Sequence, residues 1–368
     1  MLKLAHVSHH PPSSGSFELE PVELLFALAR RTQQAFSVVW LEIASRPMIR
    51  CPDIGQLEAT IAADLRRTDL LVRCDSSERM GRYAVFCPAT DAQGAKELIR
   101  RIWSVASPRP VRGGVATFPL DGLVLDDLID LALVDARGGD EQGPPIERSG
   151  LEWIRTPRAG SSGLDPRRRT AARVKRAFDL LFSAVTAPVW LPVLAGVALA
   201  IKCTDWRAPV VFPQMRTGRG GNRFQMYKFR TMVRNAEELK EKYAHLNELT
   251  WPDFKIENDP RVTRLGWFLR KTSLDELPQI LNVVRGEMSW VGPRPTSFGP
   301  ETYEIWQTAR LDVVPGVTGL WQVVGRGRTE FDERLRLDME YIDRRSFWFD
   351  LKLLFMTVRE VLRPRGGF

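Results

Sequence analysis

Short apolar runs alternate with longer amphipathic stretches over the first part of the chain. The runs 38–43 and 83–87 are rich in aliphatic and aromatic residues, as buried strands are, whereas 54–65 and 92–105 carry apolar residues at helical spacing. Strands that alternate with helices favour an α/β or α+β sandwich. We therefore predict a first domain of this kind over residues 1–140.

The composition changes after this domain. Glycine, proline, serine and arginine become frequent, as in Gly143-Pro144-Pro145 and in the segment 160–163. Such a composition is typical of a linker. We predict a linker over residues 141–170 and a second domain over residues 171–368.

A long apolar run begins the second domain. Residues 180–201 contain no charged side chain, and a bilayer is crossed by ~20 apolar residues in a helix. A helix buried in a protein core is the alternative. The arginine-rich segment 167–176 precedes the run, and next to an apolar run such a segment is suited to anionic lipid headgroups rather than to a solvated linker.

Two features of this run favour a broken helix, with its break at Pro188 and Pro192, that enters one leaflet of the membrane and returns. Pro188 and Pro192 lie in its middle, where each proline removes a backbone hydrogen bond and crowds the preceding turn. Basic residues flank both ends of the run, and basic residues favour the cytoplasmic side. We predict a re-entrant helix over about 177–201, with a kinked span as the alternative.

The remainder, 203–368, is polar enough to fold outside the membrane, and we predict that it is mainly helical. It carries most of the 11 tryptophans of the chain. Tryptophan is favoured at the headgroup layer of a membrane, although core packing explains any single one equally well. The fold class predicted for the whole chain is α+β.

The composition agrees with a globular protein and restricts its partners. The hydrophobic share is 44% and the charged share 27%, as in ordinary folded domains. A net charge of +8 and a pI near 9.5 favour acidic partners, namely nucleic acid, phosphorylated small molecules or anionic lipid. Nucleic acid is disfavoured because the main basic cluster lies beside the charge-free run.

The cysteine pattern and the N-terminus also exclude some classes. The four cysteines are scattered without a CxxC pair, which indicates neither a disulfide framework nor a zinc site. The N-terminus has no basic stretch followed by an apolar run, so we expect no cleavable signal peptide.

The strongest chemical pattern is an adjacent pair of acids, Asp275 and Glu276, at the predicted start of a helix. The apolar residues Leu274, Leu277, Ile280, Leu281 and Val284 mark the predicted buried face of that helix. Ser273 with Glu276 three residues on matches a capping box, and spacing alone favours this structural interpretation of Glu276. The catalytic interpretation uses the same place. A helix N-terminus attracts phosphate, one carboxylate can act as a nucleophile, and the other can bind a hard cation.

Basic residues occur in several motifs around this pair. Arginine and lysine neutralise phosphoryl oxygens during transfer, so a diphosphate substrate needs them. Arg294 lies between two prolines, which fix its direction, whereas Arg261 could equally belong to a basic surface facing lipid. The candidate substrate-binding residues are Lys228, Arg230, Arg261, Arg270 and Arg294.

The block from Lys175 to about Leu362 closely resembles the bacterial sugar transferases, the monotopic phosphoglycosyl transferases. Two positions depart from the pattern: Leu191 and Val314 stand where many relatives have a serine and a basic residue. Several motifs together are far more specific than one alone. The matching motifs, in family order, are Lys175–Asp179, the apolar run with Pro192, Lys228–Met232, Asn258–Arg261, Ser273–Gln279, Gly292–Pro295 and Pro315–Gln322.

This resemblance implies an activity and a mechanism. The protein would transfer a sugar 1-phosphate from a UDP-sugar to undecaprenyl (polyprenyl) phosphate and so start an exopolysaccharide, capsule or O-antigen. Asp275 would attack the β-phosphorus, release UMP and hold the phosphosugar, while Glu276 would bind Mg²⁺. Lys228, Arg270 and Arg294 match positions expected near the phosphates.

The resemblance also implies a location. The protein would be monotopic in membrane lipid, on the cytoplasmic face of a bacterial inner membrane, and a homodimer is one assembly that it allows. The sequence does not state which sugar is transferred.

Residues 1–140 resemble a degenerate GGDEF domain. Arg79-Met80-Gly81-Arg82 stands where the Gly-Gly-acid-Glu signature belongs, so the resemblance implies no cyclase chemistry. The matching segments are Arg66–Arg73, Tyr83–Pro88, Gly114–Pro119 and Asp130–Arg137.

Arg66 and Asp69 retain the spacing of that family's inhibitory cyclic di-GMP site, with a surface salt bridge as the alternative. A catalytically silent, membrane-bound regulator that senses a cyclic dinucleotide is therefore the alternative to the enzyme. The intact Asp275–Glu276 pair favours the enzyme.

Overall fold

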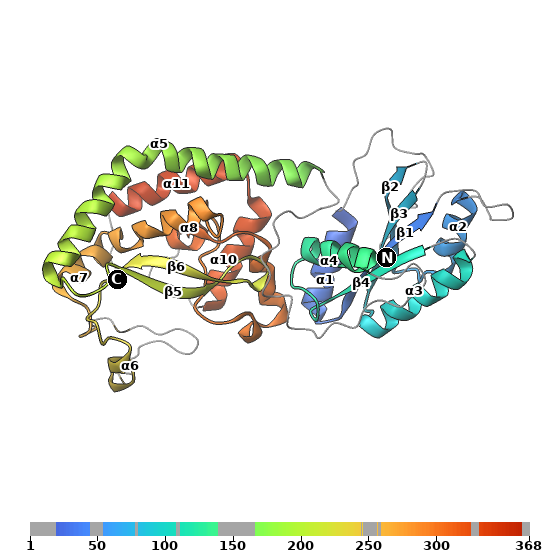
Figure 1. Ribbon diagram of the computed structural model, residues 1–368, viewed down its shortest axis with the longest axis horizontal. Coiled ribbons are helices and arrows are strands. Elements are labelled where there is room, and N and C mark those ends of the chain that lie inside the picture. Colours follow the sequence, from blue (N-terminus) through green and yellow to red (C-terminus); the bar gives the residue numbers. More distant parts are fainter. Residues whose placement is uncertain are drawn as a thin grey trace. The chain divides into compact units, whose positions relative to one another are not determined.

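The computed structural model (Figure 1) describes residues 20–44, 54–77, 80–107, 111–138, 166–243, 245, 256, 259–324 and 331–362. The chain divides into two compact units, Met1–Ala171 and Ala172–Phe368. Both units combine helices with strands, which confirms a mixed α and β protein. The predictions for Arg79, for Asn258 and for most of the linker lie outside the described residues.

The first unit contains a four-stranded antiparallel sheet with the strand order β2-β3-β1-β4. The predicted strands 38–43 and 83–87 lie within β1 and β3, and the predicted helices 54–65 and 92–105 correspond to α2 and α3. The elements are α1 (Glu20–Thr32), β1 (Phe36–Ala44), α2 (Ile54–Asp64), β2 (Leu70–Ser77), β3 (Met80–Pro88), α3 (Ala92–Ala106), β4 (Val111–Phe118) and α4 (Leu125–Gly138).

Helices cover both faces of this sheet because its central strand is apolar on both sides. Val39 and Leu41 belong to a buried cluster with residues of α2 and α3. Phe36, an even-numbered position, points to the other face, where its ring lies 5.2 Å from that of Phe26 on α1. Gly114 lets α4 approach, since a Cβ atom there would lie 2.1 Å from the Ala132 carbonyl oxygen. The result is an α/β sandwich.

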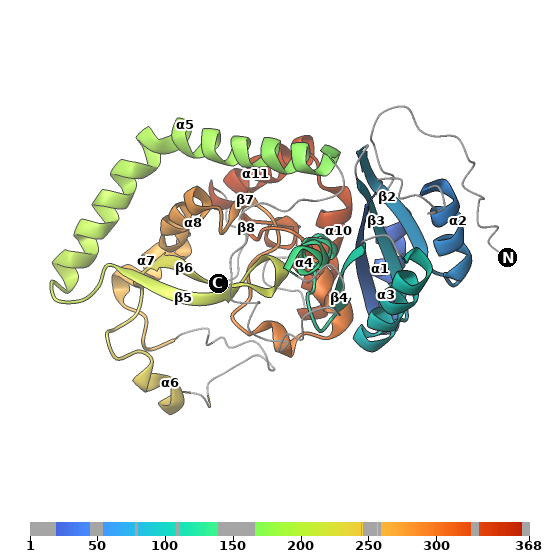
Figure 2. The same cartoon turned by 45° about the vertical axis from the view of Figure 1, so that its right-hand side comes forward.

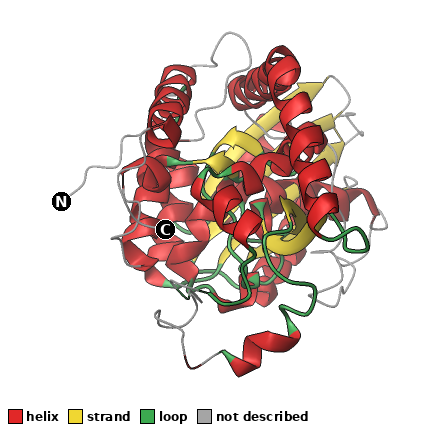
Figure 3. Ribbon diagram, turned by 90° about the vertical axis from the view of Figure 1, so that its left-hand side faces the viewer, coloured by secondary structure: helices red, strands yellow, loops and turns green. Residues whose placement is uncertain are grey.

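Helices make up most of the second unit (Figure 3). Strands β5 and β6 form an antiparallel pair, and β7 and β8 form a short parallel pair. The elements are α5 (Pro166–Thr204), β5 (Val211–Thr217), η2 (Arg219–Gly221), β6 (Arg223–Phe229), α6 (Glu238–Lys242), α7 (Arg264–Lys271), η4 (Leu274–Gln279), α8 (Ile280–Arg285), β7 (Ser289–Val291), η5 (Pro300–Thr302), η6 (Ile305–Asp312), β8 (Gly316–Thr318), α9 (Leu320–Val324), α10 (Phe331–Arg344) and α11 (Phe347–Leu362).

The apolar run forms one continuous helix, α5, which bends along its length (Figures 1 and 2). The predicted break at Pro188 and Pro192 is wrong, because both prolines lie inside this helix without ending it. The hydroxyls of Ser183 and Thr186 donate to the carbonyls of Asp179 and Phe182 one turn earlier. Prolines and such back-bonded hydroxyls both bend helices, which accounts for the shape.

Both ends of α5 pack on the same unit. Near one end, Arg176 donates hydrogen bonds to the carbonyls of Val283 and Val284 on α8. Near the other end, Ile201 is buried in a cluster with Phe229 and Leu269. Between the two ends the helix presents exposed apolar side chains, including Leu181, Val185, Val189, Leu191 and Leu199.

Candidate active site

The acidic pair lies on the 3-10 helix η4, which leads into α8. Ser273 precedes η4 in the left-handed conformation, with φ of 57°, and its side chain makes no capping hydrogen bond. The capping-box interpretation of Glu276 is therefore wrong. The chain must change direction within two residues after α7 ends at Lys271, and the left-handed turn at Ser273 provides that change instead of a cap.

The helix that follows also differs from its predicted pattern. The α-helical turns begin only at Ile280, after the 3-10 segment. Leu281 and Val284, predicted on the buried face, are exposed by 44% and 47% of their surface. The change from 3-10 to α geometry turns Leu281 and Val284 away from the direction that a uniform helix would give them. The apolar periodicity therefore predicted the wrong buried face.

Glu276 is held by two cations from distant parts of the chain. Lys228, on β6, places its Nζ atom 2.8 Å from Glu276 Oε1. Arg294, after β7, donates from Nη1 to Glu276 Oε2 at 3.0 Å and from Nη2 to Oε1. Burial alone would raise the pKa of Glu276, but Arg294 and Lys228 hold that pKa well below its usual value. Glu276 is thus anionic and fixed in place.

The surroundings of Asp275 differ from those of Glu276. It is buried, with 9% of its surface exposed, and within the described part of the chain it forms no hydrogen bond or ion pair. Burial raises its pKa above the usual aspartate value, Lys228 opposes that shift, and the charge of Glu276 adds to it. Charged side chains therefore surround the Asp275 carboxylate, but none of the described residues binds it.

Three cations surround the two carboxylates. Lys228, Arg270 and Arg294 all act electrostatically on Asp275, and Arg270 Nε donates to Thr231 Oγ1 at 3.0 Å. The site carries a formal charge of +1, which suits an anionic phosphorylated ligand. Sequence reasoning did not single out Thr231 as the partner of Arg270, because no local pattern links α7 with the residues that follow β6.

Two of the predicted substrate-binding residues, Arg230 and Arg261, form ion pairs with other carboxylates. Arg230 Nη1 lies 3.1 Å from Asp205 Oδ2, just after the end of α5. Arg261 is buried, and its guanidinium pairs with Asp259 at 2.7 Å and donates to the Ala236 carbonyl. Neither is among the charges that shift the pKa of Asp275 or Glu276 most, although Arg261 and Asp259 both act electrostatically on Arg270. Arg230 thus joins the segment after β6 to the end of α5, and Arg261 stabilises its own loop.

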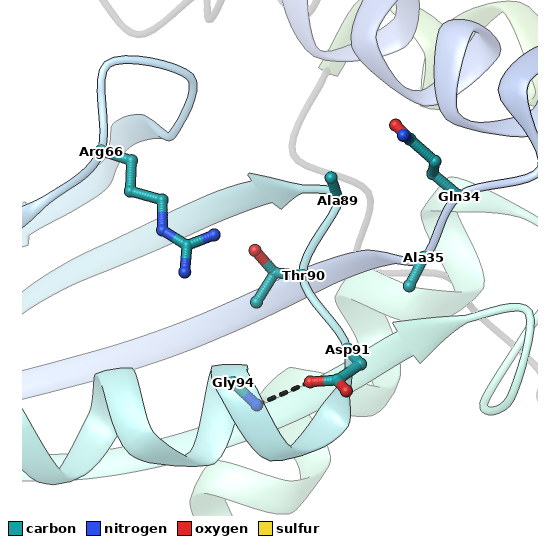
Figure 4. A pocket seen from close by; sticks show the side chains of 7 residues that line it. All are labelled: Gln34, Ala35, Arg66, Ala89, Thr90, Asp91 and Gly94. Carbon is teal, nitrogen blue, oxygen red and sulfur yellow. Dashed lines mark hydrogen bonds between the residues drawn. The ribbon is translucent and has the colours of Figure 1, made fainter.

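In the first unit, the Arg66 side chain lines a cavity of about 350 Å³ with Gln34, Thr90 and Asp91 (Figure 4). The Asp69 carboxylate accepts a hydrogen bond from the backbone N–H of Arg66 at 3.0 Å. Asp69 therefore closes its own turn, and the two side chains are not joined by the predicted salt bridge.

A free carboxylate among clustered cations, next to a long exposed apolar helix, defines a site suited to phosphoryl chemistry on a lipid-soluble substrate. Comparison with known proteins agrees with this class. Residues 170–364, more than half of the chain, match the bacterial sugar transferase family. The protein belongs to this family.

Three curated relatives illustrate the match. The undecaprenyl-phosphate galactose phosphotransferase of Salmonella typhimurium is 42% identical over 55% of this chain and 43% of its own length. The UDP-glucose:undecaprenyl-phosphate glucose-1-phosphate transferase of Escherichia coli is 36% identical over 64% of this chain and 47% of its own length. The exopolysaccharide production protein ExoY of Rhizobium meliloti is 38% identical over 53% of this chain and 88% of its own length. The chain thus spans less than half the length of the first two.

Proposed function

We propose that the protein transfers a sugar 1-phosphate from a UDP-sugar to undecaprenyl (polyprenyl) phosphate and thereby starts the assembly of a glycan. The observation that carries this proposal is Asp275, a buried carboxylate that has no partner among the described residues and lies within the field of three cations. The names of the relatives, which include galactose and glucose phosphotransferases, supply the substrate class.

The reaction proceeds in two balanced steps. An Asp275 carboxylate oxygen attacks the β-phosphorus of the UDP-sugar, the bond to the bridging oxygen breaks, and UMP leaves with the electron pair. The phosphosugar is then an acyl phosphate on Asp275. An oxygen of the polyprenyl phosphate attacks the same phosphorus, and the Asp275 carboxylate leaves, which gives polyprenyl diphosphate sugar and the free enzyme.

The surrounding cations stabilise the charge that develops on the transferred phosphoryl group. Arg294 and Lys228 are held by Glu276, so their charges are fixed before the donor arrives. Such preorganised charges cost no reorganisation at the moment of reaction. Arg270 is the third cation, and it is directed by Thr231. We propose that Lys228, Arg270 and Arg294 bind the diphosphate of the UDP-sugar.

Mg²⁺ fits this donor set only together with the substrate. The described residues contain no cluster of three acidic, histidine or cysteine side chains that could hold a metal ion by themselves. Mg²⁺ is commonly bound by one or two carboxylates together with substrate phosphates and water. Glu276 is such a carboxylate, and among the described residues its Oε2 atom accepts only one hydrogen bond, from Arg294. Glu276 would hold the ion, which would neutralise the charge of the diphosphate.

We also propose that the protein is monotopic and lies on the cytoplasmic face of the bacterial inner membrane. Helix α5 is apolar enough over Thr170–Thr204 to enter a membrane, and both its ends pack on one unit, as a re-entrant helix requires. Exposed aromatic side chains on two other helices, Trp267 on α7 and Trp348 and Phe355 on α11, suit the headgroup layer.

For the first unit, the resemblance to a degenerate GGDEF domain stays a prediction. The α/β sandwich and the cavity beside Arg66 are compatible with a ligand-binding module. A regulatory role would add to the transferase activity, not replace it, because the Asp275–Glu276 site is complete in the second unit.

One experiment tests the proposed function directly. The membrane-bound protein is incubated with a panel of UDP-sugars, with and without undecaprenyl phosphate, and UMP is measured together with the intact protein mass. We expect UMP with at least one donor and, without acceptor, a mass increase equal to one phosphosugar. Asp275→Asn should abolish both, because an amide cannot form the acyl phosphate. Turnover by Asp275→Asn would refute the covalent mechanism.

A further inference from the structure

A buried arginine outside the catalytic cluster contacts the loop that carries Arg294. Arg310, on η6, is 6% exposed, and its Nη2 atom donates to the backbone carbonyl of Arg294 at 2.6 Å. The same nitrogen lies 2.6 Å from Asp338 Oδ2 on α10, which makes an ion pair without hydrogen-bond geometry, and Asp338 is 1% exposed. One ion pair and one hydrogen bond therefore connect α10 through Arg310 on η6 to the backbone of Arg294.

The Arg294 loop depends on such external donors. Its two prolines, Pro293 and Pro295, have no N–H groups, so the loop cannot form a regular hydrogen-bonded turn of its own. The carbonyl of Pro293 accepts from the N–H of Gly316 at 2.9 Å, and that of Arg294 accepts from Arg310. Two successive carbonyls are thus fixed by other segments, one by a backbone donor and one by a charged side chain.

The backbone around Gly316 packs directly against the backbone of this loop. A Cβ atom at Gly316 would lie 2.1 Å from the Gly292 nitrogen. The loop is therefore enclosed by backbone on one side and held by Arg310 on the other. The Arg294 side chain extends out of this loop, and its guanidinium donates hydrogen bonds to both carboxylate oxygens of Glu276.

We propose that Arg310, held by Asp338, is a positioning residue that aims the Arg294 guanidinium at Glu276 and at the donor diphosphate. This role rests on the proposed function, since it assigns Arg294 to that diphosphate. A hydrogen bond from a charged donor is stronger than a neutral one, and a bound backbone carbonyl fixes the direction of the side chain on the same residue.

A purely structural ion pair is the competing explanation, and it makes a different prediction. Replacing a buried ion pair by apolar residues is often neutral for stability, whereas removing one partner is costly wherever the pair lies. A structural pair would therefore reduce activity by the same factor whether or not Arg294 is intact. A positioning residue acts through Arg294, so its effect must shrink when Arg294 is already altered.

The test is a double-mutant cycle on the first half-reaction, measured as single-turnover UMP release by the full-length protein at saturating UDP-sugar. Arg310→Met is made in the wild type and in the Arg294→Lys background. We expect a loss of about tenfold or more in the wild type and of no more than about twofold in the Arg294→Lys background. Arg310→Lys, which keeps the charge opposite Asp338, should recover part of the loss.

Controls separate this role from misfolding. Thr308→Val removes a hydroxyl that is equally buried on η6 but donates only to Ile305 within the same helix, and it should release UMP at the wild-type rate. If Arg310→Met does not fold, the cycle is run with Arg310→Lys. Equal losses in both backgrounds, with an active wild type, would overturn the positioning role alone. No UMP release by the wild type with any donor would overturn the proposed function and this role with it.

Discussion

At the scale of single residues, Glu276 is the counter-charge of Lys228 and Arg294 and not a helix cap. Glu276→Gln keeps the shape of the side chain but leaves Lys228 and Arg294 without a nearby anion. We expect UMP release to fall at least about tenfold and the free energy of unfolding to fall by about 1–3 kcal/mol, because partly buried charges lose their partner. Differential scanning fluorimetry and single-turnover kinetics measure the two effects.

The matched control is Glu340→Gln, which makes the same change in the exposed pair of Glu340 with Arg344. Exposed pairs contribute roughly 0–1 kcal/mol, so neither stability nor turnover should change appreciably. Unchanged UMP release by Glu276→Gln would contradict the arrangement inferred for the site.

The two carboxylates also predict a pH dependence. Burial raises the pKa of Asp275, so its reactive, ionised form is lost as pH falls through that raised pKa, at a higher pH than for an exposed aspartate. Glu276 stays ionised over the same range because Arg294 and Lys228 lower its pKa. The rate of UMP release without acceptor should therefore fall on the acid side with a slope of one proton.

Omitting the acceptor matters because a phosphate monoester titrates near pH 6 itself. The measurement is a single-turnover pH profile at saturating donor. A slope of two protons would mean that both carboxylates titrate together, against the assignment of separate roles.

At the scale of elements, α5 decides how the protein meets the membrane. Its bend and the packing of both its ends on one unit predict that residues near Arg169 and Arg207 lie on the same side. Single cysteines at these two positions, in a background without the native cysteines, should both resist an impermeant thiol reagent on intact spheroplasts and both react after lysis. Reaction of only one in intact spheroplasts would indicate a span.

The two prolines offer the matching perturbation. Pro188→Ala with Pro192→Ala restores two backbone hydrogen bonds and removes the crowding that bends the helix. We expect this double variant to label at one of the two cysteines in intact spheroplasts, as a straight span would. An unchanged labelling pattern would show that packing of the helix ends, not the prolines, fixes the topology.

At the scale of the whole molecule, the proposed active site belongs entirely to the second unit. Asp275, Glu276 and the three cations lie beyond Ala172, and the family match covers 170–364. A chain that begins at Pro166 should therefore release UMP within about threefold of the full-length rate. A truncated protein that is folded but inactive would show that the first unit contributes to the active site.

How much of this molecule the sequence predicts depends on how far apart the interacting residues are. The strands around 38–43 and 83–87 and the helix over the apolar run follow from local periodicity, because burial and backbone hydrogen bonding repeat along the chain. Asp275 and Glu276 can also be recognised locally, because they are adjacent acids at a predicted helix start. The capping box failed at this point, because the turn between α7 and η4 required a left-handed residue at Ser273.

The sequence by itself therefore determined the family, the apolar helix and the identity of the two carboxylates, all of which depend on neighbouring residues or on motif order. Only the tertiary structure decided which cations lie beside them: Lys228 and Arg294 contact Glu276, whereas Arg230 pairs with Asp205. The physical reason is that an ion pair between distant segments depends on how the chain folds back, and no periodic pattern along the chain records that distance.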